Sequence, residues 1–252
     1  MKTFSLRDPA FVAATAGGSS PYTALPTDYA GLLRWYRASD YEGAGYSDGD
    51  DITTDMVDQS GNGADAVPDV TNPPIYKDTI LSGGMATTYF NGTAANLDNF
   101  AITQINLDDF TVIALLVPTT QVFVMSKSVG NVQLKLTGSP VLNQTSFYPG
   151  ANPTMDTNAA AQGINAGLQA TVWQRDSGTG VGTFYVNKTQ MAEKDGQTNT
   201  TQLQLDRIGT YNLSAPGQLN LAELCIYSNV MSQANWEALY DGYFAIKYAA
   251  DI

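Results

Sequence analysis

Histidine is absent from the 252-residue chain, and cysteine occurs once, at Cys225. Without an imidazole the chain cannot form a Ser-His-Asp or Cys-His nucleophilic site, a zinc site with His ligands, or a histidine-based pH switch. A single cysteine can form no disulfide within the chain. We therefore expect none of these chemistries, and the unpaired thiol fits synthesis in a reducing cytosol.

Positive charge is scarce as well. Lys and Arg number 12 against 24 Asp and Glu, so the net charge is −12 and the pI is near 4.1. Binding to a phosphate backbone needs clustered Lys and Arg on one face, so we expect no nucleic-acid partner. Charged residues make up 14% of the chain, against roughly 25% in ordinary globular proteins. Gly, Thr, Asn, Ser and Tyr take their place, which suits strands and turns.

Long apolar runs are also missing. No stretch approaches the ~20 residues that a membrane-spanning helix needs, so we expect no membrane partner. Near the N-terminus, Arg7, Asp8 and Pro9 interrupt the apolar region that a secretory signal would require. We therefore expect no secretory leader.

Residues 1–26 are predicted to form an extended arm, because Gly17, Gly18, Pro21 and Pro26 break any periodicity there. Burial of its apolar side chains alone would not offset the cost of ordering its backbone. An ordered arm must therefore satisfy its backbone hydrogen bonds on another surface. That surface is either a partner chain or the arm's own domain. The predicted partner-binding residues are Phe4, Leu6 and Phe11.

Residues 27–252 are predicted to form one all-β domain, a length that a single sandwich commonly reaches. Short apolar runs alternate there with Gly, Asn and Pro, as in a sandwich or barrel. The run from Phe110 to Val117 is almost continuously apolar and is closed by Pro118, as expected of a strand buried on both faces. Further strands are predicted at 32–36, 121–125, 132–136, 168–173, 182–187, 203–205 and 219–227.

One helix is predicted, at the C-terminus. Ser232 can cap its first turn, and Trp236, Leu239, Tyr243 and Phe244 recur at three- and four-residue spacing to form one apolar stripe. We expect this helix to close one end or flank of the sandwich.

Both ends of the domain carry a family signature. Trp35 is followed by the turn Asp58-Gln59-Ser60-Gly61-Asn62-Gly63, and the strand Leu221–Tyr227 leads through Met231-Ser232 into the terminal helix. These segments resemble concanavalin A-like, laminin-G-like jelly-roll domains. The resemblance covers about residues 29–250. It implies a two-sheet jelly-roll sandwich that ends in a short C-terminal helix, and the predicted N-terminal arm precedes this domain. The chain departs from the family at Met56, where a Trp is usual, and at Asn91, where an Asp is common.

Two acidic clusters are candidate metal sites. Asp58, Asn62 and Asp65 have a spacing that could present oxygens to calcium, but the same residues could instead form a structural turn that binds local amides. A second cluster could equally be a solvated loop; it consists of Asp48, Asp50, Asp51 and Asp55. We expect no metal and no cofactor, with calcium at the first cluster as the alternative.

Catalytic carboxylates are not evident. Glycoside hydrolysis needs two carboxylates at a defined separation, and hydrolases on the resembled fold typically carry an E-x-D-x-E strand. The only glutamates are Glu42, Glu193, Glu223 and Glu237. Asp40 and Asp195 lie two residues from Glu42 and Glu193, but no third carboxylate completes an E-x-D-x-E triplet at either place. We therefore expect a protein that is not an enzyme, with Glu223 as a structural strand residue.

Sugar binding would use exposed aromatic rings beside Asn and Asp side chains. The candidate platforms are Tyr41, Tyr46, Tyr148 and Tyr211, which lie in predicted loops. For any one of them, packing in the core or at its rim is the alternative.

Two functions follow from these features. A jelly roll without a leader, a disulfide or a catalytic set, preceded by an adhesive arm, resembles accessory proteins of bacteriophage particles. We predict a capsid decoration or cement protein on the virion exterior, made in the host cytoplasm and held to the major capsid protein by its arm, with a homo-oligomer as a further option. The alternative is a carbohydrate-binding module that binds host glycans on the virion exterior or a tail fibre.

Overall fold

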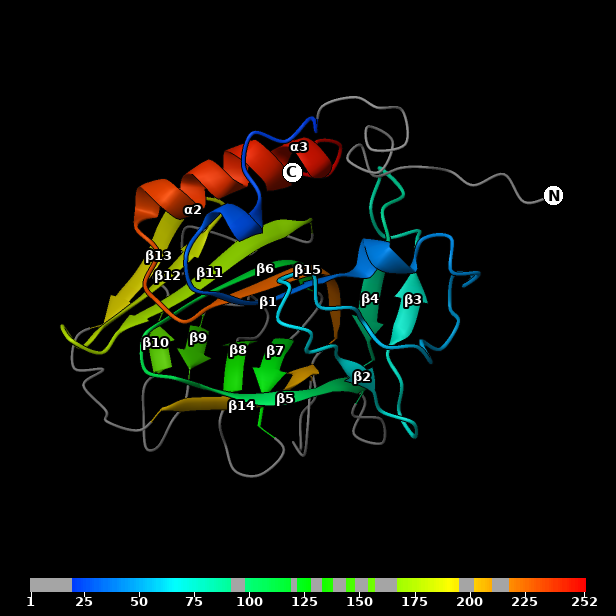
Figure 1. Ribbon diagram of the computed structural model, residues 1–252, viewed down its shortest axis with the longest axis horizontal. Helices are drawn as coiled ribbons and strands as arrows, with labels where there is room; N and C mark the ends of the chain where they lie inside the picture. The colour runs from blue at the N-terminus through cyan, green and yellow to red at the C-terminus, as the bar shows by residue number, and fades with distance from the viewer. Residues whose placement is uncertain are drawn as a thin grey trace.

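The computed structural model describes residues 20–91, 98–118, 122–127, 133–137, 144–147, 154–156, 167–194, 202–209 and 218–252. Two antiparallel sheets pack face to face, and a C-terminal helix lies across the outer side of one of them (Figure 1). This confirms the all-β sandwich with a short terminal helix. None of the described helices is long and apolar enough to cross a membrane.

The first sheet has eight strands. They are β1 (Leu32–Arg37), β3 (Ile75–Lys77), β4 (Thr87–Phe90), β6 (Phe110–Pro118), β11 (Gln169–Asp176), β12 (Val181–Val186), β13 (Thr189–Lys194) and β15 (Leu219–Tyr227). Their order is β13-β12-β11-β6-β15-β4-β3, and β1 also pairs with β15. β15 therefore has β6 along one edge, while β4 and β1 follow one another along its other edge.

The second sheet has seven strands, in the order β10-β9-β8-β7-β14-β5-β2. They are β2 (Val67–Pro68), β5 (Asn99–Leu107), β7 (Val122–Ser126), β8 (Gln133–Thr137), β9 (Gln144–Phe147), β10 (Thr154–Asp156) and β14 (Leu203–Gly209). Short helical segments complete the described secondary structure: η1 (Pro26–Asp28), η2 (Ala38–Tyr41), α2 (Gln233–Leu239), the π-helical η3 (Tyr240–Phe244) and α3 (Ala245–Lys247).

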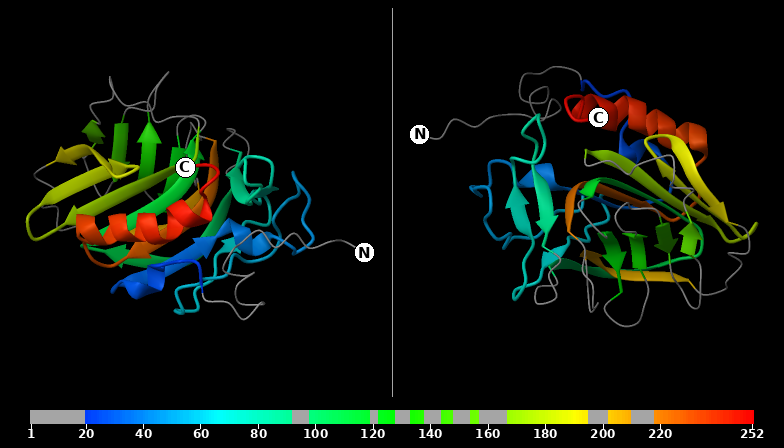
Figure 2. Two further views of the ribbon diagram at one scale, coloured as in Figure 1. Left: turned by 90° about the horizontal axis from the view of Figure 1, so that it is seen from above. Right: turned by 180° about the vertical axis from the view of Figure 1, so that it is seen from behind.

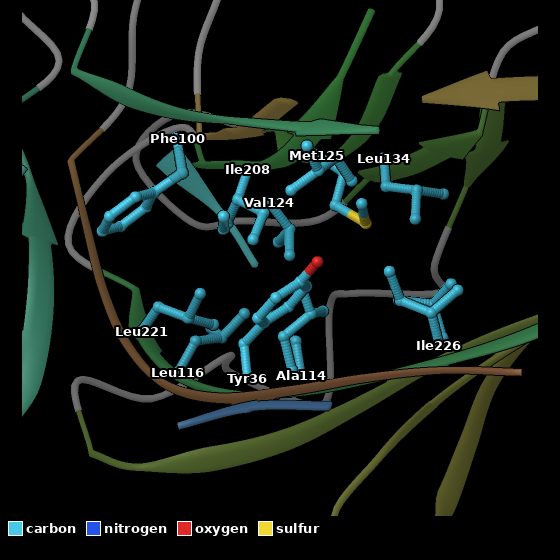
Figure 3. Close-up of a cluster of buried hydrophobic side chains, with 14 of the residues drawn as sticks. Tyr36, Phe100, Ala114, Leu116, Val124, Met125, Leu134, Ile208, Leu221 and Ile226 are labelled. Carbon is cyan, nitrogen blue, oxygen red and sulfur yellow. The ribbon is translucent and has the colours of Figure 1, made fainter. Parts of the chain in front are cut away.

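The inner core lies between the two sheets. Figure 3 shows Tyr36, Leu116 and Ile226 from the eight-stranded sheet facing Phe100 and Met125 from the other. All residues of β6 are buried, as predicted for a strand covered on both faces. The burial has two sources, because the inner face of β6 meets the second sheet and its outer face meets the helix.

A second apolar cluster lies between the outer face of the eight-stranded sheet and the helix. Trp236 and Leu239 of α2 pack there with Ile113, Leu115 and Val172 of the sheet. The helix starts as predicted, since the Ser232 hydroxyl accepts the backbone N–H of Asn235 at 3.3 Å. The predicted apolar stripe is therefore the contact between helix and sheet.

The last residues of the predicted arm lie on this helix (Figures 1 and 2). Tyr22 is buried with its ring centroid 4.7 Å from that of Tyr243, and the backbone N–H of Thr23 donates to the Gly242 carbonyl at 3.1 Å. We call residues 20–26 the strap. Phe4, Leu6 and Phe11 lie outside the described residues, so the predicted arm contacts stay predictions.

Candidate functional site

The Gly-rich turn after Met56 is joined to β1 through Asp58. One carboxylate oxygen of Asp58 accepts the backbone N–H of Trp35 at 3.0 Å and that of Ser60 at 2.9 Å, and the other accepts the Ser60 hydroxyl at 2.8 Å. The residue is 6% exposed. Both oxygens are thus engaged within the protein.

The other two residues of the calcium alternative complete the same turn. The Asn62 amide donates to the carbonyls of Leu32 at 3.1 Å and Leu33 at 2.9 Å, while the Asp65 carboxylate accepts the backbone N–H of Asp58 at 2.8 Å. These are the contacts that a structural turn requires. Among the described residues, no three His, Cys, Asp or Glu side chains are grouped as metal ligands. Calcium binding at this turn stays a prediction.

The second acidic cluster lies in a well-bonded loop. The Asp48 carboxylate accepts hydrogen bonds from Lys77 Nζ at 3.2 Å and from the hydroxyl of Thr79 at 3.0 Å, and Asp50 accepts the backbone N–H of Ser47 at 2.6 Å. Partial burial raises the pKa of Asp48, but the hydrogen bonds outweigh it and hold that pKa below its ordinary value. These carboxylates therefore serve the loop's own structure.

The predicted sugar platforms differ in outcome. Tyr41 is 4% exposed and donates its hydroxyl to the Thr54 carbonyl at 3.1 Å, so for Tyr41 the structure agrees with packing in the core and not with an exposed platform. Tyr46 is half-buried, stacks on Tyr76 and is fixed by hydrogen bonds at its hydroxyl oxygen. It presents part of a rigid ring. Two further candidates, Tyr148 and Tyr211, lie outside the described residues.

Glu223 is fully buried beneath the C-terminal helix. It forms an ion pair with Lys247 and accepts hydrogen bonds from Tyr243 at 3.0 Å, Tyr248 at 3.1 Å and the Trp35 indole at 3.1 Å. A carboxylate with four internal partners and no exposed surface has a structural role, as the sequence indicated. No pattern in the sequence indicated Lys247 as its partner.

Burial moves the pKa of the Asp98 carboxylate toward neutrality. It is 4% exposed and accepts the backbone N–H of Asn91 at 2.7 Å. Burial raises its pKa to about 6; the hydrogen bond from Asn91 acts in the opposite direction, and the nearby Asp51 and Asp69 raise it further. Perturbed carboxylates of this kind gather at functional sites, which draws attention to the end of β4.

Solved structures with the same fold include domains of carbohydrate-active enzymes and of toxins. Domain 4 of AbnA, a GH43 extracellular arabinanase from Geobacillus stearothermophilus solved with arabinotriose, matches at a TM-score of 0.55 and 13% identity, over 84% of this chain and 98% of that domain. The binding domain of Paraclostridial Mosquitocidal Protein 1 matches at 0.59 and 13% identity, over 87% of this chain and 53% of that one. The Trypanosoma rangeli sialidase matches at 0.53 and 13% identity, over 88% of this chain and 33% of that one.

These matches define the class of the fold, a β-sandwich shared with domain 4 of the arabinanase and with the binding domain of the mosquitocidal protein. The chain spans about half of the toxin domain and a third of the sialidase. No model of a known protein family matches the sequence, and no curated protein matches it either.

Proposed function

We propose that this protein is a non-catalytic carbohydrate-binding module. The observation that carries the proposal is the shared fold with AbnA domain 4, which extends over 98% of that domain and was solved with arabinotriose bound. A binding domain of botulinum neurotoxin serotype D, solved with N-acetylneuraminic acid, supports it at a TM-score of 0.55 and 8% identity. A single module of this kind binds a sugar weakly, and several linked modules bind more tightly because the later contacts form within one complex.

The contacts of three described glutamate side chains support the absence of catalysis. Glu42 accepts the backbone N–H of Ala86 at 2.9 Å, and Glu237 accepts the Gln233 amide on the helix surface at 2.8 Å. Glu223 is enclosed with Lys247. Each of these three groups thus has a local structural partner.

A glycan array probed with the purified 252-residue chain tests the proposal. We expect specific, weak binding to a small set of oligosaccharides, confirmed by titration calorimetry, with no reducing sugar released on long incubation. Failure to bind any glycan at millimolar concentration would contradict the module, and sustained release of sugar would contradict the absence of catalysis.

The second candidate function is that of a virion decoration protein held by its N-terminal arm. The contacts of the strap determine which deletion can test it. Because Tyr22 is buried and the Pro26 carbonyl accepts the Tyr227 hydroxyl at 3.1 Å, deletion of residues 1–26 would also disturb the sandwich. Deletion of residues 1–19 leaves the strap in place. Loss of particle incorporation by that folded variant is the expected result, and normal incorporation would contradict an anchoring arm.

A further inference from the structure

We propose that the sugar-contact surface is the place where β4 meets the start of β15, and that it takes an uncharged sugar. We call this surface the amide–tyrosine patch; it consists of Tyr89, Asn91, Gln218 and Asn220. The proposal deepens the carbohydrate-binding function and depends on it.

Strand register brings the four side chains together. Tyr89 lies directly opposite Asn220 in the antiparallel pair of β4 and β15. One step further along, the Gln218 amide donates to the Asn91 side-chain oxygen at 3.5 Å. Directly paired residues, and residues two apart on one strand, share a face of a sheet. Phe90, between Tyr89 and Asn91, belongs to the inner core, so the patch lies on the outer face, where β4 and β15 run side by side (Figure 2).

The patch combines accessible and buried polar groups. Tyr89, Asn91 and Gln218 are half-buried, whereas Asn220 is 3% exposed. Within the described part of the chain, the Asn220 side-chain oxygen has no hydrogen-bond partner. A buried polar atom in this condition destabilises the fold, and native proteins seldom keep one unless water or a ligand satisfies it.

Two polar residues of the other sheet provide a contrast. Gln104 and Asn106, exposed polar residues of β5, are paired with one another, since the Gln104 amide donates to the Asn106 oxygen at 2.8 Å. An unpartnered amide oxygen beside a half-buried tyrosine is a different arrangement. It leaves a buried acceptor beside the half-buried side chains of the patch, and a ligand hydroxyl can satisfy it when those side chains move aside.

The chemistry of the four side chains fits a sugar. A sugar ring presents hydroxyl groups at its rim and C–H groups on its faces. Amide side chains supply both donors and acceptors for hydroxyls, and a tyrosine supplies an apolar ring with a polar tip. The patch therefore offers the two kinds of contact that a sugar needs.

Charge selects the kind of sugar. The carboxylate of Asp98 is bonded to one residue of the patch, since it accepts the Asn91 backbone N–H at 2.7 Å. The chain as a whole carries a net charge of −12. Both features repel an anionic ligand. Neutral oligosaccharides are therefore favoured over sialylated or uronic-acid-containing ones.

Titration of the full chain with arabinotriose, and with the neutral oligosaccharide that ranks first on the array, tests the patch. Asn220→Ala is the central variant because it removes the unpartnered oxygen. Its melting temperature should equal or exceed that of the wild type. Its affinity for the sugar should fall roughly fivefold to tenfold, the equivalent of one hydrogen bond. Tyr89→Ala and Gln218→Ala should also weaken binding. Tyr89→Phe retains the ring if Tyr89→Ala fails to fold.

Two substitutions elsewhere complete the test. Gln104→Ala removes an amide from the other sheet and should bind as the wild type does. Tyr46→Ala removes the half-buried ring of the other candidate platform; loss of binding in that folded variant alone would place the contact at the loop and overturn the patch. If the wild type binds and the patch variants bind equally well, the patch is wrong and the module stands. A higher melting temperature of Asn220→Ala with unchanged affinity would also overturn the patch, as would tighter binding of sialylated than of neutral sugars. If the wild type binds no glycan, the proposed function itself fails.

Discussion

Lys247 and Glu223 form an ion pair whose two side chains have no exposed surface. The Glu223 carboxylate is also bonded to Tyr243, Tyr248 and the Trp35 indole. Lys247 donates in addition to the Ser39 hydroxyl at 3.0 Å. A buried charge is tolerated only when its partners replace the lost water. The pair therefore joins helix, strand and η2 at one point, beneath the strap.

Lys247→Met is expected to destabilise the fold by about 3–5 kcal/mol, because it leaves the Glu223 carboxylate buried without a counter-charge. Urea denaturation followed by tryptophan fluorescence measures the loss. The matched control is Lys188→Met, which removes a partly exposed ion pair with Asp241 at 2.8 Å and should cost less than about 1 kcal/mol. Equal costs for the two variants would contradict the structural importance of the buried pair.

The strap packs so closely on the helix that no side chain fits at Gly242. A Cβ atom at this position would lie 2.7 Å from the Thr23 hydroxyl and 2.8 Å from the Ala24 Cβ. Gly242→Ala should therefore destabilise the protein by about 1–3 kcal/mol, even though alanine is the better helix former by about 1 kcal/mol. Thermal denaturation measures the change. Gly167→Ala, where nothing lies within 4 Å of the added atom, should be close to neutral, and a stabilising Gly242→Ala would show that the strap does not hold this position.

Two experiments distinguish a structural turn at Asp58 from a calcium site there. Asp58→Ala removes the acceptor for the backbone N–H groups of Trp35 and Ser60 and should cost about 2–4 kcal/mol. The melting temperature of the wild type should be the same in calcium and in a chelator. A rise of several degrees in calcium, lost in Asn62→Ala, would instead support the calcium alternative.

The sequence was sufficient to predict elements with a local pattern. The apolar run ending at Pro118, the strand Leu219–Tyr227 and the Ser232 cap all match the structure closely. Each of these signals lies within a few residues, since strand burial, turn residues and helix capping depend on near neighbours. The π-helical turn at Tyr240–Phe244 was not predicted, because it coincides with a backbone contact from the distant strap.

The candidate sites were less predictable because they depend on residues far apart in the chain. Tyr89 and Asn220 meet only through strand register, which no local pattern encodes. Tyr41 lies beside glycines and reads as a loop residue, yet it is buried at the end of η2. The ion pair of Lys247 with Glu223 likewise depends on how the helix packs on the sheet, which no local pattern encodes.

Asp98 should give the protein a specific pH dependence. Burial raises its pKa from 3.8 in the unfolded chain to about 6 in the folded one. Between these two values the folded protein binds more protons than the unfolded chain, so protonation of Asp98 stabilises the fold. The contribution is present in full below about pH 4 and is lost as the pH rises through 6.

Asp98→Asn isolates this effect, because asparagine keeps an oxygen to accept the Asn91 N–H but does not titrate. From pH 4 to pH 7 the wild type should lose on the order of 2 kcal/mol of stability relative to the variant, as measured by urea denaturation at each pH. Asp40, whose pKa burial also raises against the opposing effect of Arg37, is present in both proteins and cancels in the difference. Parallel stability curves for the two proteins would mean that Asp98 ionises as readily in the folded protein as in the unfolded chain.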